Sequence, residues 1–140
     1  MLEDDRKRIV LIDDHLLLRE GVERLLNLGD EFVVCEDAGT AAEGIEMVRE
    51  MRPDAVVVDV GLPGGTDGFA VTRQLLGEFP HLVIIVLSAH DEPEFAAHAL
   101  AAGAMAYVRK GAGADELRSA LRDAFKGKRR FGHETLREAS

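Results

Sequence analysis

Apolar, β-branched runs recur about every 25 residues along the chain, and a helical pattern follows each of them. Most runs are unbroken and do not alternate between apolar and polar residues. Unbroken runs are typical of strands in a parallel sheet that helices cover on both faces. The expected strands are residues 9–12, 32–35, 55–60, 82–87 and 106–108.

The segments between these runs carry apolar residues at helical spacing, so each expected helix has one apolar face. Thr40 and Glu43 form a capping-box pair before the second helix. Pro53 follows that helix, Pro80 follows the third, and Asp91 is in position to cap the fourth. The residues expected on the apolar faces are Leu18, Val22, Leu25 and Leu26, then Ala41, Ile45 and Val48, then Val71, Leu75 and Phe79, then Phe95, Ala99 and Ala102, then Leu117, Leu121 and Phe125.

Five strand–helix units in 140 residues predict a single α/β domain with a doubly wound, five-stranded parallel sheet. In folds of this kind, functional groups gather outside the carboxyl ends of the strands, near the point where the strand order reverses. The residues that follow the strands are therefore the candidates for chemistry.

Composition excludes several classes of protein. No apolar run is long enough to cross a bilayer, so we expect no membrane association, and the charged start of the chain is not a secretory signal. Cys35 is the single cysteine, so no internal disulfide can form, and we expect a cytoplasmic location and a packing role for this side chain. The net charge is -9, which argues against nucleic-acid binding by the body of the domain. The segment from Lys126 onward differs, because it carries net positive charge.

Polar side chains end four of the five expected strands. Asp13 and Asp14 follow the first strand, Asp59 the third, Ser88 the fourth and Lys110 the fifth. Each has an ordinary alternative when taken alone: an aspartate that caps the first helix, a loop hydroxyl, or a solvated lysine. Asp59 is harder to explain in this way, because a carboxylate after three valines is costly to bury without a partner.

Three carboxylates at one edge of a sheet repel one another and require a cation. Oxygen ligands suit Mg²⁺, and one divalent ion with one ammonium group balances three carboxylate charges. Such a pocket favours a phosphoryl group in transfer. The sequence has no HExxH or CxxC motif for zinc, no phosphate-binding P-loop, no dinucleotide-binding glycine loop and no G-x-S-x-G nucleophile motif.

The strand ends resemble those of the receiver domain of bacterial two-component response regulators. The resemblance spans about residues 8–126, and it rests on the segments VLIDDH at 10–15, VVDVGLP at 57–63, LSAH at 87–90, GA at 103–104 and YVRK at 107–110. The DDH sequence, the Lys110-Gly111 ending and GKRRF at 127–131 are most similar to the LuxR/NarL-type subfamily. The resemblance implies a flavodoxin-like (βα)5 fold with strand order 2-1-3-4-5.

The resemblance also implies roles for the residues of the site. Asp59 would accept a phosphoryl group from a phosphohistidine of a sensor histidine kinase. Asp14, Asp59 and the backbone carbonyl of Gly61 would bind Mg²⁺ directly, and Asp13 would act through water. Lys110 would hold a phosphoryl oxygen.

Ser88 would turn inward to the phosphoryl group, and Tyr107 would follow as a rotating aromatic side chain, although Tyr107 could instead be an edge aromatic packed on alanines. Gly61 and His90 occupy positions that tune acyl-phosphate lifetime in the family, and His90 either contacts the phosphoryl group or faces water. The fourth helix, fifth strand and fifth helix would carry the readout.

Two departures from the family pattern stand near the site. Gly111 replaces the proline that usually follows the active-site lysine, and the loop of residues 63–68 is one residue longer than usual. We expect residues 1–7 to be an N-terminal extension, 8–126 the receiver domain, and 127–140 a basic tail or the start of a linker to a DNA-binding output domain absent from this chain.

Alternative functions remain open from the sequence. The chain could be a stand-alone receiver that acts by protein contact, a Mg²⁺-dependent aspartyl phosphohydrolase, or a scaffold that never accepts phosphate. A phosphohydrolase usually needs a second acid two residues after its nucleophile, where this chain has Gly61. In the receiver reading the protein is a phosphoacceptor and not an enzyme. Leu16, Leu17 and Leu28 fall outside the apolar face of the first helix, and they indicate either partly buried helix edges or a homodimer patch on the first and fifth helices.

Overall fold

The computed structural model describes residues 5–90 and 93–131. Strands and helices alternate throughout, as the hydrophobic pattern predicts. The elements are β1 (Lys7–Ile12), α1 (Leu16–Asn27), β2 (Phe32–Ala38), α2 (Ala41–Met51), β3 (Ala55–Asp59), α3 (Gly68–Glu78), β4 (Val83–Ser88), α4 (Pro93–Ala102), β5 (Ala106–Arg109), the 3-10 turn η1 (Lys110–Ala112) and α5 (Ala114–Phe125).

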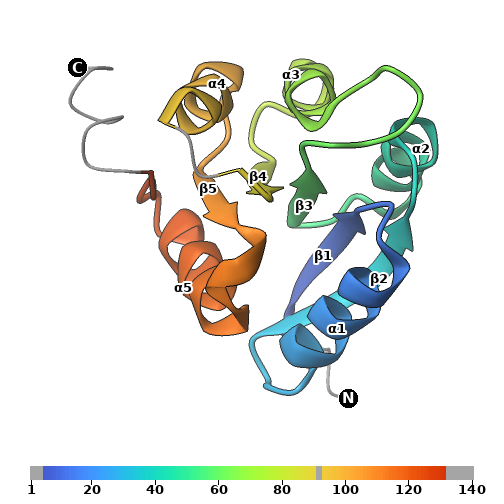
Figure 1. Cartoon of the computed structure of the whole chain (residues 1–140). Coiled ribbons are helices and arrows are strands. Elements are labelled where there is room, and N and C mark those ends of the chain that lie inside the picture. The colour runs from blue at the N-terminus through green and yellow to red at the C-terminus, as the bar shows by residue number, and fades with distance from the viewer. Residues whose placement is uncertain (1–4, 91–92, 132–140) are drawn as a thin grey trace.

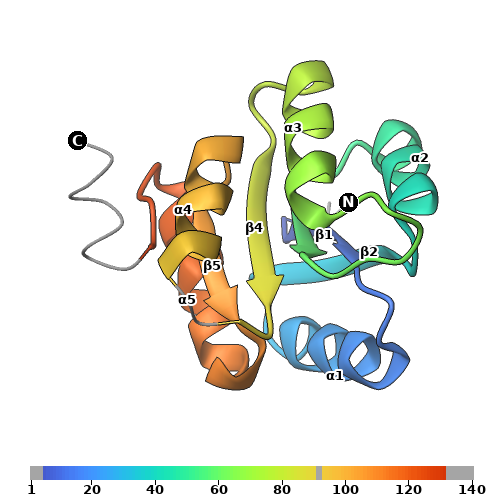
Figure 2. The same ribbon diagram turned by 45° about the horizontal axis from the view of Figure 1, so that its top comes forward.

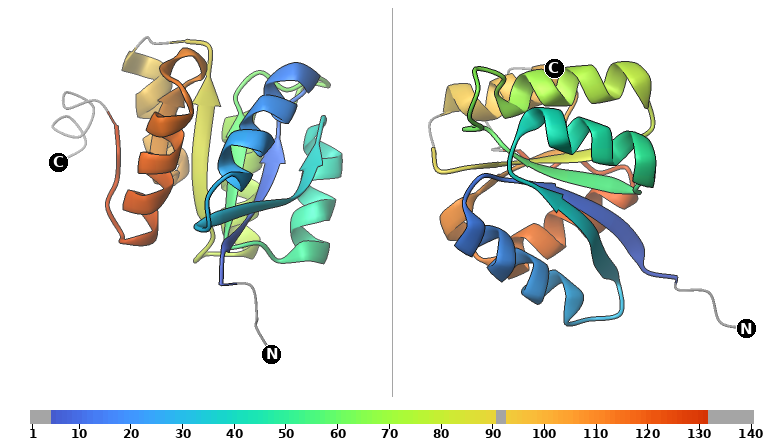
Figure 3. Two further views of the ribbon diagram at one scale, coloured as in Figure 1. Left: turned by 90° about the horizontal axis from the view of Figure 1, so that it is seen from below. Right: turned by 90° about the vertical axis from the view of Figure 1, so that its right-hand side faces the viewer.

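The five strands form one parallel sheet in the order β2-β1-β3-β4-β5, which confirms the predicted fold and strand order. The strand order changes direction between β1 and β3, the two neighbouring strands near the centre of the sheet. Helices α2, α3 and α4 cover one face of the sheet, and α1 and α5 cover the other, as the right-hand view of Figure 3 shows. The carboxyl ends of all strands lie along one edge of the sheet (Figure 1).

The unbroken apolar runs supply two cores at once, because successive side chains of a strand point to opposite faces. In β1, Val10 and Ile12 pack beneath α2 and α3, whereas Ile9 and Leu11 pack beneath α1 and α5. All four side chains are fully buried. The sheet is therefore held rigidly from both sides, and the loops at its carboxyl edge start from fixed positions.

Two details of the elements differ from expectation. Strand β2 continues through Ala38, beyond its apolar run, because it pairs with β1 along its whole length, with a register shift between Ile9 and Val10. Leu25 does not share the buried face of α1: it is 41% exposed, whereas Leu26 is 1% exposed. Consecutive helix positions are about 100° apart, so only one of the two leucines can face the sheet.

The helix caps agree with expectation where the structure describes them. The backbone N–H of Glu43 donates to Thr40 Oγ1 at 3.2 Å, which is one half of the capping box at α2. Asp91, expected to cap α4, lies outside the described residues. Within the described ranges, no helix has the length and apolarity that crossing a membrane requires.

The chain after α5 returns to the sheet. Arg130 forms a parallel bridge with Ala106 at the outer edge of β5, where its N–H donates to the Met105 carbonyl at 2.9 Å and its carbonyl accepts from the Tyr107 N–H at 3.1 Å. Figure 2 shows this short red segment at the β5 edge of the molecule. We refer to residues 128–131 as the C-terminal strap.

Candidate functional site

The predicted polar side chains meet at the carboxyl edge of the central strands. Asp13 follows β1, Asp59 is the last residue of β3, and Lys110 follows β5. The Lys110 ammonium lies 3.0 Å from Asp59 Oδ2 and 3.3 Å from Asp13 Oδ2. Strand order explains the meeting, because β1 and β3 are neighbours at the centre of the sheet and the Lys110 side chain reaches across from β5.

Burial sets the electrostatics of Asp59, which is only 3% exposed. Loss of hydration raises the pKa of this carboxyl group, the close contact with the Lys110 ammonium lowers it, and the nearby Asp13 carboxylate raises it. The net effect is a raised pKa. The Gly61 N–H adds a long hydrogen bond to Asp59 Oδ1, at 3.3 Å. Lys110 therefore offsets part of the cost of keeping a charged carboxylate beneath the surface.

The negative charge of the site exceeds the positive charge. Asp13, Asp14, His15 and Asp59 each place one possible ligand atom within 4.8 Å of the other three. Asp13 Oδ2 and Asp59 Oδ2 are buried and make no hydrogen bond of good geometry with the described part of the chain. Two buried carboxylate oxygens that face one ammonium and remain short of hydrogen bonds suit a hard divalent cation such as Mg²⁺. The donor set therefore fits the metal that the sequence predicts.

His15 belongs to the site, although the sequence indicated no role for it. Its Nδ1 lies 3.2 Å from Asp13 Oδ1, 3.4 Å from Asp14 Oδ1 and 3.0 Å from Lys110 Nζ. The backbone N–H of His15 also donates to Asp13 Oδ1 at 2.8 Å, so this oxygen is occupied by the start of α1. The only sequence signal for His15 was its position directly after the two aspartates.

Ser88 lies at the end of β4 and is fully buried, but its hydroxyl is turned to its own loop. Ser88 Oγ accepts a hydrogen bond from the His90 N–H at 3.0 Å. The Tyr107 hydroxyl donates to the His90 backbone carbonyl. The loop after β4 is thus held at His90 by two bonds, one from its N–H to a serine of the site and one from its carbonyl to a tyrosine of β5.

The His90 ring points to α4. It stacks on Phe95 with 4.3 Å between ring centroids and 3° between the ring planes. In this conformation the ring packs on the helix while the residue stays exposed, so of the two orientations that the sequence left open it is closer to the one that faces water. Gly61 is exposed beside Asp59, and the two glycines of the lengthened loop, Gly64 and Gly65, have φ angles of 87° and 83°. Such angles favour glycine, so these residues allow the loop its sharp turn.

Known proteins of one family match this chain. A family model described as the response regulator receiver domain matches residues 9–122. The transcriptional regulatory protein DegU of Brevibacillus brevis is 35% identical over 126 residues, which is 90% of this chain and 53% of that protein. The response regulator GacA of Pseudomonas viridiflava is 37% identical over 122 residues, 87% of this chain and 56% of that protein.

Solved structures agree with the sequence relatives. The crystal structure of a LuxR-family two-component response regulator from Aurantimonas sp. SI85-9A1 superposes with a TM-score of 0.86 at 34% identity, covering 95% of this chain and 94% of that one. The signal receiver domain of a NarL response regulator from Mycobacterium tuberculosis gives a TM-score of 0.83 at 33% identity, covering 89% of this chain and 99% of that one. The chain therefore belongs to the response regulator receiver domain family, in its LuxR/NarL-type subfamily.

Proposed function

We propose that Asp59 is the phosphoacceptor of this receiver and that Mg²⁺ assists the transfer. The observation that carries the proposal is the contact of the buried Asp59 carboxylate with Lys110, beside the buried Asp13 Oδ2 and within a cluster of side chains that could hold a metal ion. An Asp59 oxygen forms the new bond to phosphorus while the P–N bond of a kinase phosphohistidine breaks. The protein is then a regulatory phosphoacceptor that assists its own phosphorylation and hydrolysis, and not an enzyme acting on separate substrates.

The residues of the site divide the work. Asp14, Asp59, the Gly61 carbonyl and, through water, Asp13 would hold Mg²⁺, which would neutralise charge on the phosphoryl oxygens. Lys110 is already placed to bind one phosphoryl oxygen, because its ammonium contacts the acceptor carboxylate directly. Ser88 and Tyr107 serve as the switch. A phosphoryl group on Asp59 would accept a hydrogen bond from the Ser88 O–H, and turning of the Ser88 side chain toward it would break the bond that Ser88 Oγ accepts from the His90 N–H and so loosen the loop that Tyr107 holds.

Intact mass spectrometry tests this function. The protein is incubated with acetyl phosphate and Mg²⁺, beside an Asp59→Asn variant and a sample with chelator. We expect one added phosphoryl group on the parent protein and none on either control. No adduct on the parent, or an equal adduct on Asp59→Asn, would contradict the proposal. Repeated turnover of a small phosphate ester would instead favour a phosphohydrolase.

The output of the switch is proposed from the relatives. The chain spans about half the length of the curated relatives it matches, 53% of DegU and 56% of GacA. We propose that it is the receiver part of a cytoplasmic transcription regulator that reaches DNA through a separate output domain. Residues 8–126 would form the receiver, preceded by the extension 1–7, and 127–140 would begin the linker. Strand β5 with α4 and α5 would carry the readout, because Tyr107 and the strap meet there.

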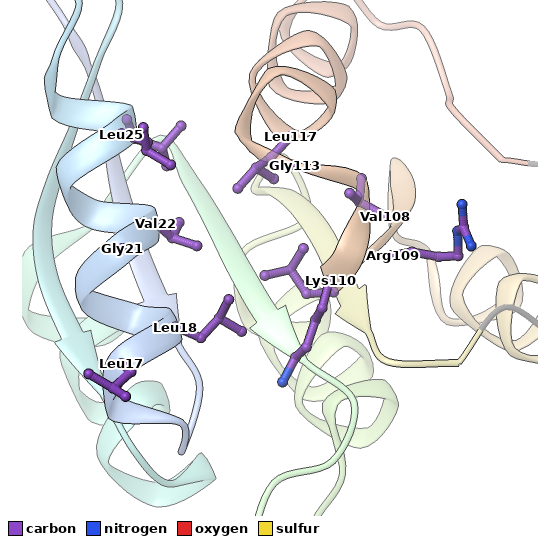
Figure 4. A pocket seen from close by; sticks show the side chains of 12 residues that line it. Leu17, Leu18, Gly21, Val22, Leu25, Val108, Arg109, Lys110, Gly113 and Leu117 are labelled. Carbon is purple, nitrogen blue, oxygen red and sulfur yellow. The ribbon is translucent and has the colours of Figure 1, made fainter.

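We propose that phosphorylation also promotes a homodimer through α1 and α5. A groove of about 250 Å³ separates these helices, and its lining is mainly apolar. Figure 4 shows Leu18, Val22 and Leu25 of α1 facing Leu117 across this groove, with Lys110 at one end and Leu17 on the outer side of α1 near that end. Leu17 is 85% exposed and Leu28 is 74% exposed. Because the groove begins at the active-site lysine, a change at Asp59 is next to the proposed contact surface.

A further inference from the structure

Arg19 connects α1 to the ends of two strands from a nearly enclosed position. Its side chain is 17% exposed, which is low for an arginine on a surface helix. Nη1 donates to the backbone carbonyl of Asp13 at 2.9 Å, and Nε lies 3.3 Å from Asp37 Oδ1 near the end of β2. Arg19 has no role in the proposed phosphoryl transfer, and it lies outside the sequence motifs of the site.

The Asp13 carbonyl needs such a donor. Strand β1 stops pairing with β2 and β3 at Ile12, so the Asp13 carbonyl lies past the last paired residue of the strand. The N–H side of Asp13 is still held, because it donates to the Ala38 carbonyl at 2.9 Å. A buried carbonyl without a partner is costly, and Arg19 supplies the partner. The guanidinium thus holds the peptide that joins Asp13 to Asp14.

The surroundings of Arg19 keep its guanidinium in this position. A side chain at Gly39 would crowd it, since an added Cβ would lie 3.0 Å from Nη1. Acids also surround Arg19. Asp37 pairs with Arg19, and Glu23 on the next turn of α1 interacts with Asp37, Arg19 and Glu20. The negative charges of α1 and β2 and the absence of a side chain at Gly39 therefore keep the Arg19 guanidinium next to the Asp13 carbonyl.

We propose that Arg19 is a positioning residue for the metal site, because it fixes the Asp13–Asp14 peptide so that both carboxylates face the cation. The inference rests on the proposed function for the identity of the cation. It is independent of the phosphoryl transfer that follows. Partners outside the first ligands of a metal commonly change its affinity 10–100-fold when they are removed.

Electrostatics alone predicts the opposite effect, which makes the test sharp. Arg19 is a positive charge close to a cation site, so removing it should strengthen Mg²⁺ binding if charge were its only influence. If Arg19 instead acts by fixing the Asp13–Asp14 peptide, removing it should weaken Mg²⁺ binding. The sign of the change therefore separates the two roles.

Isothermal titration calorimetry with Mg²⁺ measures that sign in the whole chain. We expect Arg19→Gln to raise the Kd for Mg²⁺ by about 5- to 20-fold. Arg24→Gln removes the same charge from an exposed position of α1 and should leave the Kd unchanged or slightly lower. Asp37→Asn should weaken binding in the same direction, and the double variant should show less than the product of the two effects, because both act through one contact.

Arg19→Lys provides a second test if Arg19→Gln fails to fold. Lysine keeps the charge, but its single ammonium group cannot contact the Asp13 carbonyl and Asp37 together as the planar guanidinium does. We therefore expect a Kd for Mg²⁺ between those of the parent and Arg19→Gln. An Arg19→Lys or Arg19→Gln protein that binds Mg²⁺ as tightly as the parent would overturn the inference. At saturating Mg²⁺, either variant should be phosphorylated by acetyl phosphate at a rate close to that of the parent protein. If the parent binds Mg²⁺ but takes no phosphoryl group, the proposed function fails while the affinity comparison still decides the role of Arg19.

Discussion

At the scale of single residues, Gly68 packs tightly against the backbone of Asp59, the proposed phosphoacceptor. It is buried at the start of α3, where a Cβ would lie 2.3 Å from the Asp59 carbonyl oxygen. Backbone cannot move aside as a flexible side chain can, so Gly68 is required for the path of the chain between β3 and α3. Sequence patterns could not reveal this requirement, because the contact joins residues nine positions apart through a loop.

Gly68→Ala tests that requirement. We expect it to lower the free energy of unfolding by about 1–3 kcal/mol through overpacking, and to slow phosphorylation by displacing Asp59. Gly77→Ala in the same helix is the control, since a Cβ there meets nothing within 4 Å. It should be neutral or stabilise by up to about 1 kcal/mol. Urea unfolding and the acetyl phosphate reaction measure both effects, and equal behaviour of the two variants would refute the steric argument.

Glu23 makes stability depend on pH. Burial, then a hydrogen bond and charge from Asp37, raise the pKa of Glu23 to about 7. The folded protein therefore holds a proton that the unfolded chain releases at lower pH, and the stability from this group declines as pH rises from about 4.5 to 7. We expect Glu23→Gln to be more stable than the parent at pH 8 by about 1–2 kcal/mol, with the difference shrinking toward pH 5.

Urea unfolding of Glu23→Gln at the two pH values checks this prediction. Glu50→Gln, at an exposed position of α2 that is not among the groups acting on Glu23, serves as the control for removal of one negative charge. A stability difference that stays constant between pH 5 and pH 8 would show that Glu23 does not titrate as described.

At the scale of elements, the C-terminal strap completes the edge of the sheet at β5. Arg130 holds it by two backbone hydrogen bonds and by side-chain contacts to Glu116 at 3.1 Å and Asp123 at 2.7 Å. The contact with Arg130 lowers the pKa of Asp123. The strap accepts a hydrogen bond from the Tyr107 N–H, and the Tyr107 hydroxyl donates to the loop after β4. Tyr107 therefore joins that loop to the chain that follows α5.

Arg130→Gln should release the strap with little effect on the rest of the fold. Exposed and half-buried ion pairs contribute little to global stability, so we expect the free energy of unfolding to fall by less than about 1 kcal/mol. Hydrogen exchange at the Tyr107 amide should become several-fold faster, because its acceptor is the Arg130 carbonyl. Arg129→Gln, at the exposed neighbouring position, should leave that exchange unchanged. Equal exchange in all three proteins would contradict a strap held by Arg130.

At the scale of the whole molecule, the two helical layers present different surfaces. The layer of α1 and α5 carries the apolar groove and the exposed leucines, whereas α4 on the other side presents mainly small residues. A dimer formed through α1 and α5 would bury leucine side chains, each contributing roughly 1.5–3 kcal/mol when it is fully removed from water.

Leu17→Glu tests that dimer. Analytical ultracentrifugation of the phosphorylated proteins should show dimers for the parent and monomers for Leu17→Glu, because a charge would enter the apolar groove. Ala101→Glu puts the same charge on an exposed position of α4 and should still dimerise. The reverse result, with Ala101→Glu monomeric and Leu17→Glu dimeric, would place the interface on the opposite layer.

Local patterns in the sequence were enough to predict the fold and the core of the site. Runs such as 55–60 and 82–87 showed buried parallel strands, and the polar residues at their ends placed Asp59 and Ser88 at one edge. Both predictions depend on unbroken apolar runs, on the helical period of 3.6 residues between them and on the rule that parallel strands share a carboxyl edge. Neighbouring residues already encode the runs and the period.

Only the tertiary structure decided which distant groups meet. It placed His15 among the acids, turned the His90 ring onto Phe95, exposed Leu25, and brought Arg19 to the Asp13 carbonyl. These contacts depend on how far a strand continues past its apolar run, on how each helix is rotated about its axis relative to the sheet, and on how far a side chain extends toward a neighbouring element. Packing between elements sets all three, and the hydrophobic pattern of any single element contains no information about its neighbour's position.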